Sequence, residues 1–159
     1  MRHRSQIGFT LLELVVTVAI IGILASITVP LAELTVRRTK EAELRSSLRQ
    51  IREALDAYKR AADEGRIAKG VGESGYPKKL EDLVIGVPDQ RNPGESKVIF
   101  LRRLPRDPFN TDSSVSAERT WAKRSYASPY NKPQEGADVF DISSRSDDIG
   151  LNGLPYREW

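Results

Sequence analysis

A single apolar stretch near the amino terminus constrains this chain more than any other feature. From residue 9 to residue 29, Glu13 is the only side chain that carries a charge. About 20 apolar residues, each adding about 1.5 Å to a helix, cross the hydrocarbon core of a bilayer. A helix buried in a soluble core is the alternative, but such helices are seldom apolar on every face over about six turns. The stretch therefore predicts a membrane-spanning helix.

The charges that flank this stretch indicate its orientation. Arg2 and Arg4 precede it, which favours an amino end in the cytoplasm and a remainder that faces outward. Arg37, Arg38 and Lys40 follow the stretch and weaken this asymmetry. The sequence predicts a single-pass protein with its polar part outside the cytoplasm.

Small residues at Ala25 and Ser26 resemble the cleavage site of a secretory signal peptide. The apolar run is long for a signal, however, and Glu13 lies close to its start. Burying a charged side chain within the bilayer costs several kcal/mol, so a charged residue at such a position is expected to have a function. Glu13 is therefore expected to need a partner.

Cleavage between Gly8 and Phe9 would supply that partner. It creates an α-amino group at Phe9, four residues before Glu13 and so on the same helical face. The carboxylate would also meet the positive end of the helix dipole. In a bundle of such helices, Glu13 could neutralise the amine of a neighbouring copy instead. The alternative is a glutamate that extends to the lipid headgroups, and the residues alone favour neither.

The order of these features resembles the amino-terminal signature of type IV pilins and pseudopilins. The residues concerned are Gly8-Phe9-Thr10-Leu11-Leu12-Glu13, the apolar run after them, and Pro30. The resemblance implies cleavage after Gly8 by a membrane prepilin peptidase, N-methylation of Phe9, and a charge-pairing role for Glu13 during assembly. Pro30 lies where such proteins commonly carry a proline that loosens the helix.

Beyond Pro30 the apolar residues fall on one helical face only. Steps of four and three connect Leu44, Leu48, Ile51, Leu55, Tyr58 and Ala62. This stripe predicts a second helix half, continuous with the first, that packs on the rest of the chain. The predicted divisions are a leader removed from residues 1–8, a transmembrane and filament-core helix over 9–32, an amphipathic helix half over 33–64, and a periplasmic globular head over 65–159.

The second half of the chain is not mainly helical, because eight of the nine prolines lie at or beyond Pro77. We expect a short helix over 79–84, a loop over 86–96 and an extended segment over 100–109. Strands are expected over 121–127 and 138–142. A third short strand is expected over 155–159.

Four short motifs in this half resemble major pseudopilins of type II secretion, in the same order. They are Tyr76-Pro77, Arg103-Leu104-Pro105-Arg106-Asp107-Pro108-Phe109, Val139-Phe140-Asp141-Ile142-Ser143 and Asp147-Asp148-Ile149-Gly150. The resemblance implies an α+β, pilin-like fold, in which the long amino-terminal helix packs on a small antiparallel sheet with a loop-rich carboxy-terminal region.

The resemblance also implies a function. The chain would be a structural subunit, held in the inner membrane with its amino terminus in the cytoplasm and its head in the periplasm. Copies would polymerise into a periplasmic pseudopilus that drives protein export. Minor pseudopilins, an inner-membrane assembly platform and the prepilin peptidase would be its partners. The alternative is a subunit of a surface type IV pilus, which shares the first thirty residues.

Composition argues against two other classes of protein. The chain has no cysteine, and its one histidine, His3, lies in the predicted leader, so Ser-His and Cys-His pairs are excluded from the processed chain. Loss of Arg2 and Arg4 leaves 23 basic against 22 acidic residues, and no basic cluster is interleaved with aromatics as a nucleic-acid surface needs. A membrane-anchored enzyme or binding domain is the least favoured reading.

Four aspartates crowd into eleven residues near the carboxy terminus: Asp138, Asp141, Asp147 and Asp148. Clustered oxygen ligands suit Ca²⁺, which also takes backbone carbonyls. The resemblance implies a calcium site that includes Asp147, Asp148 and the backbone carbonyl of Ile142.

Two alternatives to calcium stay open. The loop between Ile142 and Asp147 is short, and Ser144 or Arg145 stands where a further acidic ligand is expected. Arg145 could neutralise the carboxylates without a metal. The aspartates could also be solvated turn residues, chosen for turn geometry.

Overall fold

A computed structural model describes residues 9–92, 94 and 96–159 of the chain. The predicted leader, including Gly8, lies outside the described residues. Contacts within the chain form two compact units, one that ends at Thr39 and one that runs from Lys40 to Trp159. We call the second unit the head and describe each unit by itself.

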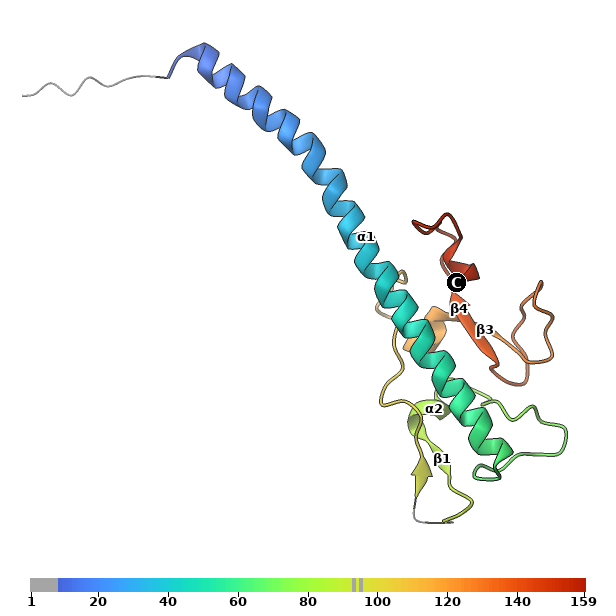
Figure 1. Ribbon diagram of the computed structural model, residues 1–159. Helices are drawn as coiled ribbons and strands as arrows, with labels where there is room; N and C mark the ends of the chain where they lie inside the picture. The colour runs from blue at the N-terminus through green and yellow to red at the C-terminus, as the bar shows by residue number, and fades with distance from the viewer. Residues whose placement is uncertain (1–8, 93, 95) are drawn as a thin grey trace, which may run out of the picture. The chain divides into compact units, whose positions relative to one another are not determined.

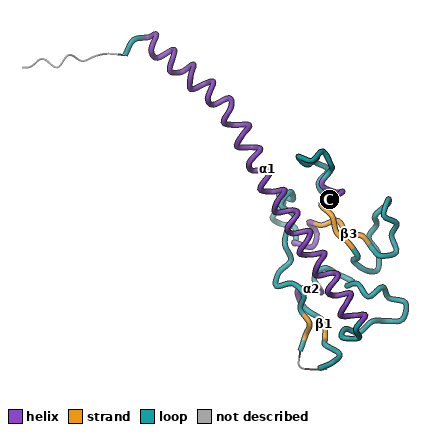
Figure 2. Tube along the Cα trace, viewed as in Figure 1, coloured by secondary structure: helices purple, strands orange, loops and turns teal. Residues whose placement is uncertain are grey.

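A long helix, α1, spans Leu11–Asp63 (Figures 1 and 2). The helix was expected to begin at residue 9, but Phe9 and Thr10 precede it. Thr10 acts as an N-cap, because its Oγ1 accepts a hydrogen bond from the backbone N–H of Glu13 at 3.2 Å. At the other end Gly65, with φ of +68°, lets the chain leave the helix, and the N–H of Arg66 donates back to the Ala61 carbonyl at 2.9 Å.

The predicted apolar stripe is confirmed as the core of the head. Leu44, Leu48, Ile51 and Leu55 are almost fully buried, and Tyr58 packs beside them. The other buried members of this cluster are Ala54 of α1 and, from the region after α1, Leu80, Leu83, Trp121, Val139, Ile142 and Tyr156. The amphipathic helix half therefore has its partner within the chain.

Two small antiparallel sheets complete the head. Strand β1, Val87–Pro88, pairs with β2, Lys97–Val98, after the short helix α2, Asp82–Ile85. Strand β3, Trp121–Arg124, pairs with β4, Asp141–Ser144, so that Trp121 lies opposite Ser144. A 3-10 helix, Ala117–Thr120, leads into β3. The result is the predicted α+β, pilin-like fold.

Three expectations for the head need correction. The region 86–96 was expected to be a loop, but Val87–Pro88 forms one side of the first sheet. Strand β4 begins three residues later than predicted. The third strand, expected over 155–159, is a 3-10 helix at Tyr156–Glu158. It forms because the N–H of Glu158 donates back to the Pro155 carbonyl at 2.9 Å, and only Pro155 makes a strand-like bridge, to Ile149.

Candidate functional site

Residues 9–26 present apolar side chains on every face of the chain. All of them are exposed, and the apolar part of α1 is long enough to cross a membrane while none of it is buried. The hydroxyls of Thr17 and Ser26 donate to backbone carbonyls three residues earlier, at 2.8 and 2.7 Å. Their polar atoms thus need no water, which suits a lipid environment.

Glu13 lies in the first turn of α1, and Thr10 and Glu13 have the spacing of a capping box. Phe9 is exposed and lies two residues before the helix. The predicted pairing of Glu13 with the amine of Phe9 requires cleavage after Gly8, which lies outside the described residues. α1 runs on through Pro30 without a break.

The block around Asp107 locks a loop onto the second sheet. Asp107 is buried, and its two carboxylate oxygens accept from the Ser144 hydroxyl at 2.5 Å and from the Phe109 N–H at 2.8 Å. Its own N–H donates to Thr120 Oγ1 at 3.2 Å. Next to it, the indole N–H of Trp121 donates to the Pro105 carbonyl at 2.9 Å. The motif that resembles pseudopilins therefore has a structural role in this chain.

Glu41 is a buried carboxylate that connects the carboxy-terminal segment, residues 141–159, to α1. Its Oε1 accepts from the Leu151 N–H at 2.7 Å and from the Tyr156 hydroxyl at 3.0 Å, while Arg45 lies 3.8 Å from its other oxygen. The ring of Tyr156 stacks on Phe109, with 4.0 Å between the centroids. Glu41 thus has hydrogen-bond donors around it, as burial of a charge demands.

Arg52 binds the same segment from one face of α1. Its guanidinium donates to Asp141 Oδ1 at 2.8 Å and to the backbone carbonyls of Ile142 and Trp159 at 3.0 and 2.7 Å. These three acceptors lie 89 to 107 residues further along the chain. One side chain therefore joins α1, β4 and residue 159.

The residues predicted to bind calcium do not fit the ion as they lie here. The carbonyl of Ile142 already accepts from Arg52. Asp147 is 81% exposed and forms an ion pair with Arg157 at 2.7 Å, and Asp148 is also exposed. Among the described residues, no group of three His, Cys, Asp or Glu side chains is placed to hold a metal. Calcium stays a prediction of the resemblance.

One alternative to calcium was that Arg145 neutralises the aspartates, and the structure shows that it binds other groups. Its guanidinium donates to the Trp121 carbonyl at 3.0 Å and to Glu135 at 3.1 Å. That assignment was wrong because Arg145 immediately follows β4, where it lies close to the paired strand β3. The neutralising arginines are Arg52 for Asp141 and Arg157 for Asp147.

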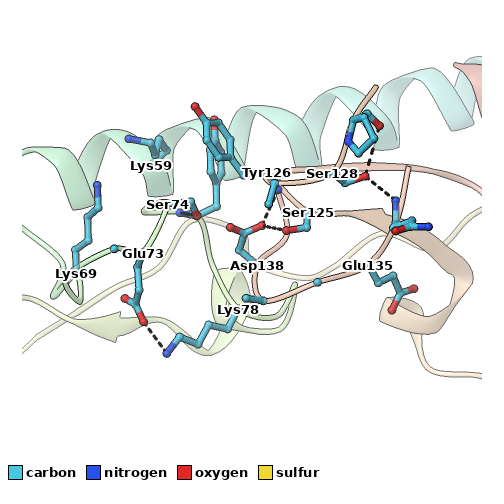
Figure 3. Close-up of a pocket in the computed structure, with 17 residues that line it drawn as sticks. Lys59, Lys69, Glu73, Ser74, Lys78, Ser125, Tyr126, Ser128, Glu135 and Asp138 are labelled. Carbon is cyan, nitrogen blue, oxygen red and sulfur yellow. Dashed lines mark hydrogen bonds and ion pairs between the residues drawn. The ribbon is translucent and has the colours of Figure 1, made fainter. Parts of the chain in front are cut away.

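The fourth aspartate, Asp138, belongs to a surface hollow on another part of the head (Figure 3). Its Oδ1 accepts from the Ser125 hydroxyl and the Tyr126 N–H, both at 2.8 Å. Partial burial alone would raise the pKa of Asp138, but hydrogen bonds from Ser74, Tyr126 and Ser125 outweigh it and hold the pKa below its ordinary value. Asp138 therefore closes the loop between residues 125 and 138.

Sequence reasoning assigned no role to Glu41, Arg52 or Asp107. A signal existed for Glu41, because it continues the apolar stripe one turn before Leu44, where a charge is unexpected. Asp107 stood in a motif recognised by resemblance alone. Arg52 gave no signal, because its acceptors include two backbone carbonyls that no side-chain pattern reports.

Comparison with known proteins found a short amino-terminal motif and relatives that match most of the chain. The family model described as the prokaryotic N-terminal methylation motif matches residues 3–29. The type II secretion system core protein G of Pseudomonas aeruginosa is 32% identical over 157 residues, which cover 94% of this chain and 97% of that protein. The protein of the same name from Klebsiella michiganensis is 33% identical over 116 residues, or 70% of this chain and 74% of that protein.

A pilus protein is also similar. The type IV major fimbrial protein FimA of Dichelobacter nodosus is 32% identical over 124 residues, which cover 74% of each chain. None of the solved structures matches the chain.

Proposed function

The chain belongs to the family of type II secretion system core protein G, the major pseudopilins, and we propose that the apolar half of α1 is both its membrane anchor and its assembly surface. The protein is a structural subunit of a pseudopilus and not an enzyme. Copies polymerise into a periplasmic filament whose growth drives protein export.

The exposed apolar surface of residues 9–26 carries this proposal. These apolar side chains are exposed in the described structure, so an apolar environment outside the chain would cover them. Lipid supplies it before assembly, and the same helix of neighbouring subunits supplies it afterwards. Since both environments are apolar, the helix can leave one for the other, and close side-chain packing then decides which subunits stay together.

Processing would prepare the subunit for that transfer. We expect a prepilin peptidase to cut between Gly8 and Phe9 and the new amino group of Phe9 to be methylated. The match to the methylation motif over residues 3–29 supports this step. Glu13 would then pair with the Phe9 amine, of its own subunit or of a neighbour, and set the register of the filament. Pro30 lacks an N–H, so the helix has one hydrogen bond fewer there and would bend more readily during packing.

The partners and topology belong to the same proposal. The subunit lies in the inner membrane with its amino terminus in the cytoplasm, as Arg2 and Arg4 favour, and the head lies in the periplasm. An inner-membrane assembly platform would extract it, and minor pseudopilins would join the same filament.

Replacement of Glu13 tests the pairing directly. We expect Glu13→Ala to insert into the membrane normally but to lower the yield of sheared filaments at least tenfold, because the amine of Phe9 loses its counter-charge. Glu33→Ala is the matched control, since Glu33 is an exposed glutamate on the same helix beyond the apolar segment. Intact mass of both proteins would report leader loss and methylation. Normal filament yield from a processed Glu13→Ala protein would refute the pairing.

A surface pilus is the second candidate, because the fimbrial protein is 32% identical over 74% of this chain, close to the 33% over 70% of the Klebsiella michiganensis protein. Residues 104–108 belong to one of the motifs that resemble major pseudopilins, and this resemblance favours the pseudopilus. Electron microscopy of cells at native expression separates the two. Filaments that extend far beyond the outer membrane would support the pilus.

A further inference from the structure

Three polar side chains of α1 face the carboxy-terminal segment, which we define as residues 141–159. Glu41, Arg45 and Arg52 follow one another at steps of four and seven and therefore share a helical face. Glu41 accepts two hydrogen bonds from the segment, and the Arg45 guanidinium lies 4.4 Å from the ring centre of Trp159. Arg52 donates to Asp141, Ile142 and Trp159. This face of α1 therefore makes polar and cation–π contacts to the segment.

The acceptors of Arg52 are the kind of ligand that calcium uses. They are one carboxylate oxygen and two backbone carbonyls, and the Ile142 carbonyl is itself one of the predicted calcium ligands. A guanidinium satisfies such oxygens with directed N–H groups and a delocalised positive charge. A divalent cation near Ile142 would have to displace these bonds.

Asp147 also has a cationic partner within the chain, and the backbone of Asp148 is held by hydrogen bonds. Asp147 pairs with Arg157 at 2.7 Å, and both side chains are exposed. The Ser146 hydroxyl accepts from the Asp148 N–H at 3.2 Å, and the Asp148 carbonyl accepts from the Tyr156 N–H at 3.0 Å. The loop is therefore closed by groups of the chain itself.

The turn after Asp148 is also held by contacts within the chain. The N–H of Gly150 donates to the Leu154 carbonyl at 2.8 Å. A Cβ at Gly150 would lie 2.5 Å from the ring of Trp159, closer than side-chain atoms approach one another. Trp159 thus fills the space beside the turn, with Arg45 and Arg52 bound to it from α1.

We propose that the Arg52 guanidinium is a metal-independent clip, which holds β4 and Trp159 to α1 and makes the stability of the head independent of calcium. The clip replaces the ion that the resemblance to major pseudopilins implies. It concerns the folding of the head alone, so it stands or falls separately from filament assembly.

The first test uses the full-length chain in detergent micelles. Trp121 and Trp159 both lie in the head, so tryptophan fluorescence follows its thermal unfolding. We expect the same midpoint, within about 2 °C, in millimolar calcium chloride and in excess EGTA. A calcium-dependent rise of several degrees that Asp148→Ala abolishes would overturn the proposal.

The second test removes the clip. We expect Arg52→Met to lower the midpoint by roughly 5–10 °C, because three hydrogen bonds from a charged group are lost. Arg60→Met is the matched control, since Arg60 is an exposed arginine of the same helix, and it should leave the midpoint unchanged. Asp141→Asn should add little to Arg52→Met, because the two side chains act as one unit.

Equal midpoints for Arg52→Met and Arg60→Met, or full additivity with Asp141→Asn, would contradict the clip. If Arg52→Met does not fold, Arg52→Lys provides the comparison. Lysine keeps the charge but lacks the planar fork, so we expect the midpoint of Arg52→Lys to stay below that of the native chain. An unchanged midpoint would show that charge alone suffices and would overturn the proposal. The calcium measurement on the unaltered chain does not depend on any variant.

Discussion

Residues 11–26 and residues 40–63 belong to one helix, yet their apolar side chains are used in opposite ways. In the first segment every side chain is exposed, and in the second a stripe from Leu44 to Leu55 is almost fully buried. The core of the head is therefore supplied by the chain itself, whereas the first segment, in the proposed function, depends on lipid or on other subunits. In that proposal one helix serves folding at one end and assembly at the other.

A charge in the exposed segment should separate these two uses most sharply. We expect Ile20→Arg to reduce filament yield by more than tenfold, because an arginine at the centre of a membrane helix costs about 2.5–3.5 kcal/mol. The thermal midpoint of the head, measured by tryptophan fluorescence in detergent, should not change, while Ile20→Val should behave as the native chain does. A lower midpoint for Ile20→Arg would show that the head depends on the apolar segment.

A cavity in the head should have the complementary effect. Ile51 is fully buried, and Ile51→Ala should lower the free energy of unfolding by about 2–5 kcal/mol through lost burial and an unfilled space. Ile23→Ala makes the same chemical change in the exposed segment and should leave that free energy unaltered. Urea unfolding of both variants, followed by tryptophan fluorescence, measures the difference, and equal losses would remove the distinction between the two regions.

A smaller effect on the stability of the head is expected from the charge of Asp138. The pKa of Asp138 is held below its ordinary value of about 3.9, so its ionised form stabilises the head above that pH. At pH 7 we expect Asp138→Asn to lower the free energy of unfolding by about 0.5–1 kcal/mol, because the side chain is only partly buried.

The difference between Asp138→Asn and the native chain should shrink as the pH falls below about 4, since the carboxylate of the unfolded chain takes up a proton first and the native carboxylate follows at its lower pKa. Thermal midpoints of the two proteins at pH 7 and pH 3 measure this. An equal difference at both values would mean that the charge of Asp138 contributes nothing to stability.

The periodic spacing of apolar residues predicted the regular part of the fold, which is the long helix α1. The spacing of Leu44, Leu48, Ile51 and Leu55 predicted both a helix and its buried face, and both are confirmed. The apolar run predicted a membrane-spanning helix from residue 9; the helix is present but begins at Leu11, because a hydroxyl at Thr10 caps its first turn, and its place in a membrane stays a prediction.

Irregular parts of the head were harder to predict, since local polar contacts decide them. Strand β4 begins at Asp141 rather than at Asp138, because Asp138 binds Ser125 and Tyr126 instead of joining the strand pair. The last residues form a 3-10 turn because the N–H of Glu158 finds its acceptor at Pro155. The role of Arg52 depends on atoms 89 to 107 residues away, and no local pattern in a sequence encodes such a meeting.

The long separation between Glu41 or Arg52 and their partners also orders the folding of the subunit during translocation. Contacts that close loops of 89 to 115 residues form slowly, because a large loss of chain entropy precedes them. If the subunit is anchored as proposed, its helix reaches the membrane first, and the charged face of α1 meets its partners only when residues 141–159 have crossed. In that topology, a subunit arrested during translocation would leave these charges in water and its core stripe uncovered.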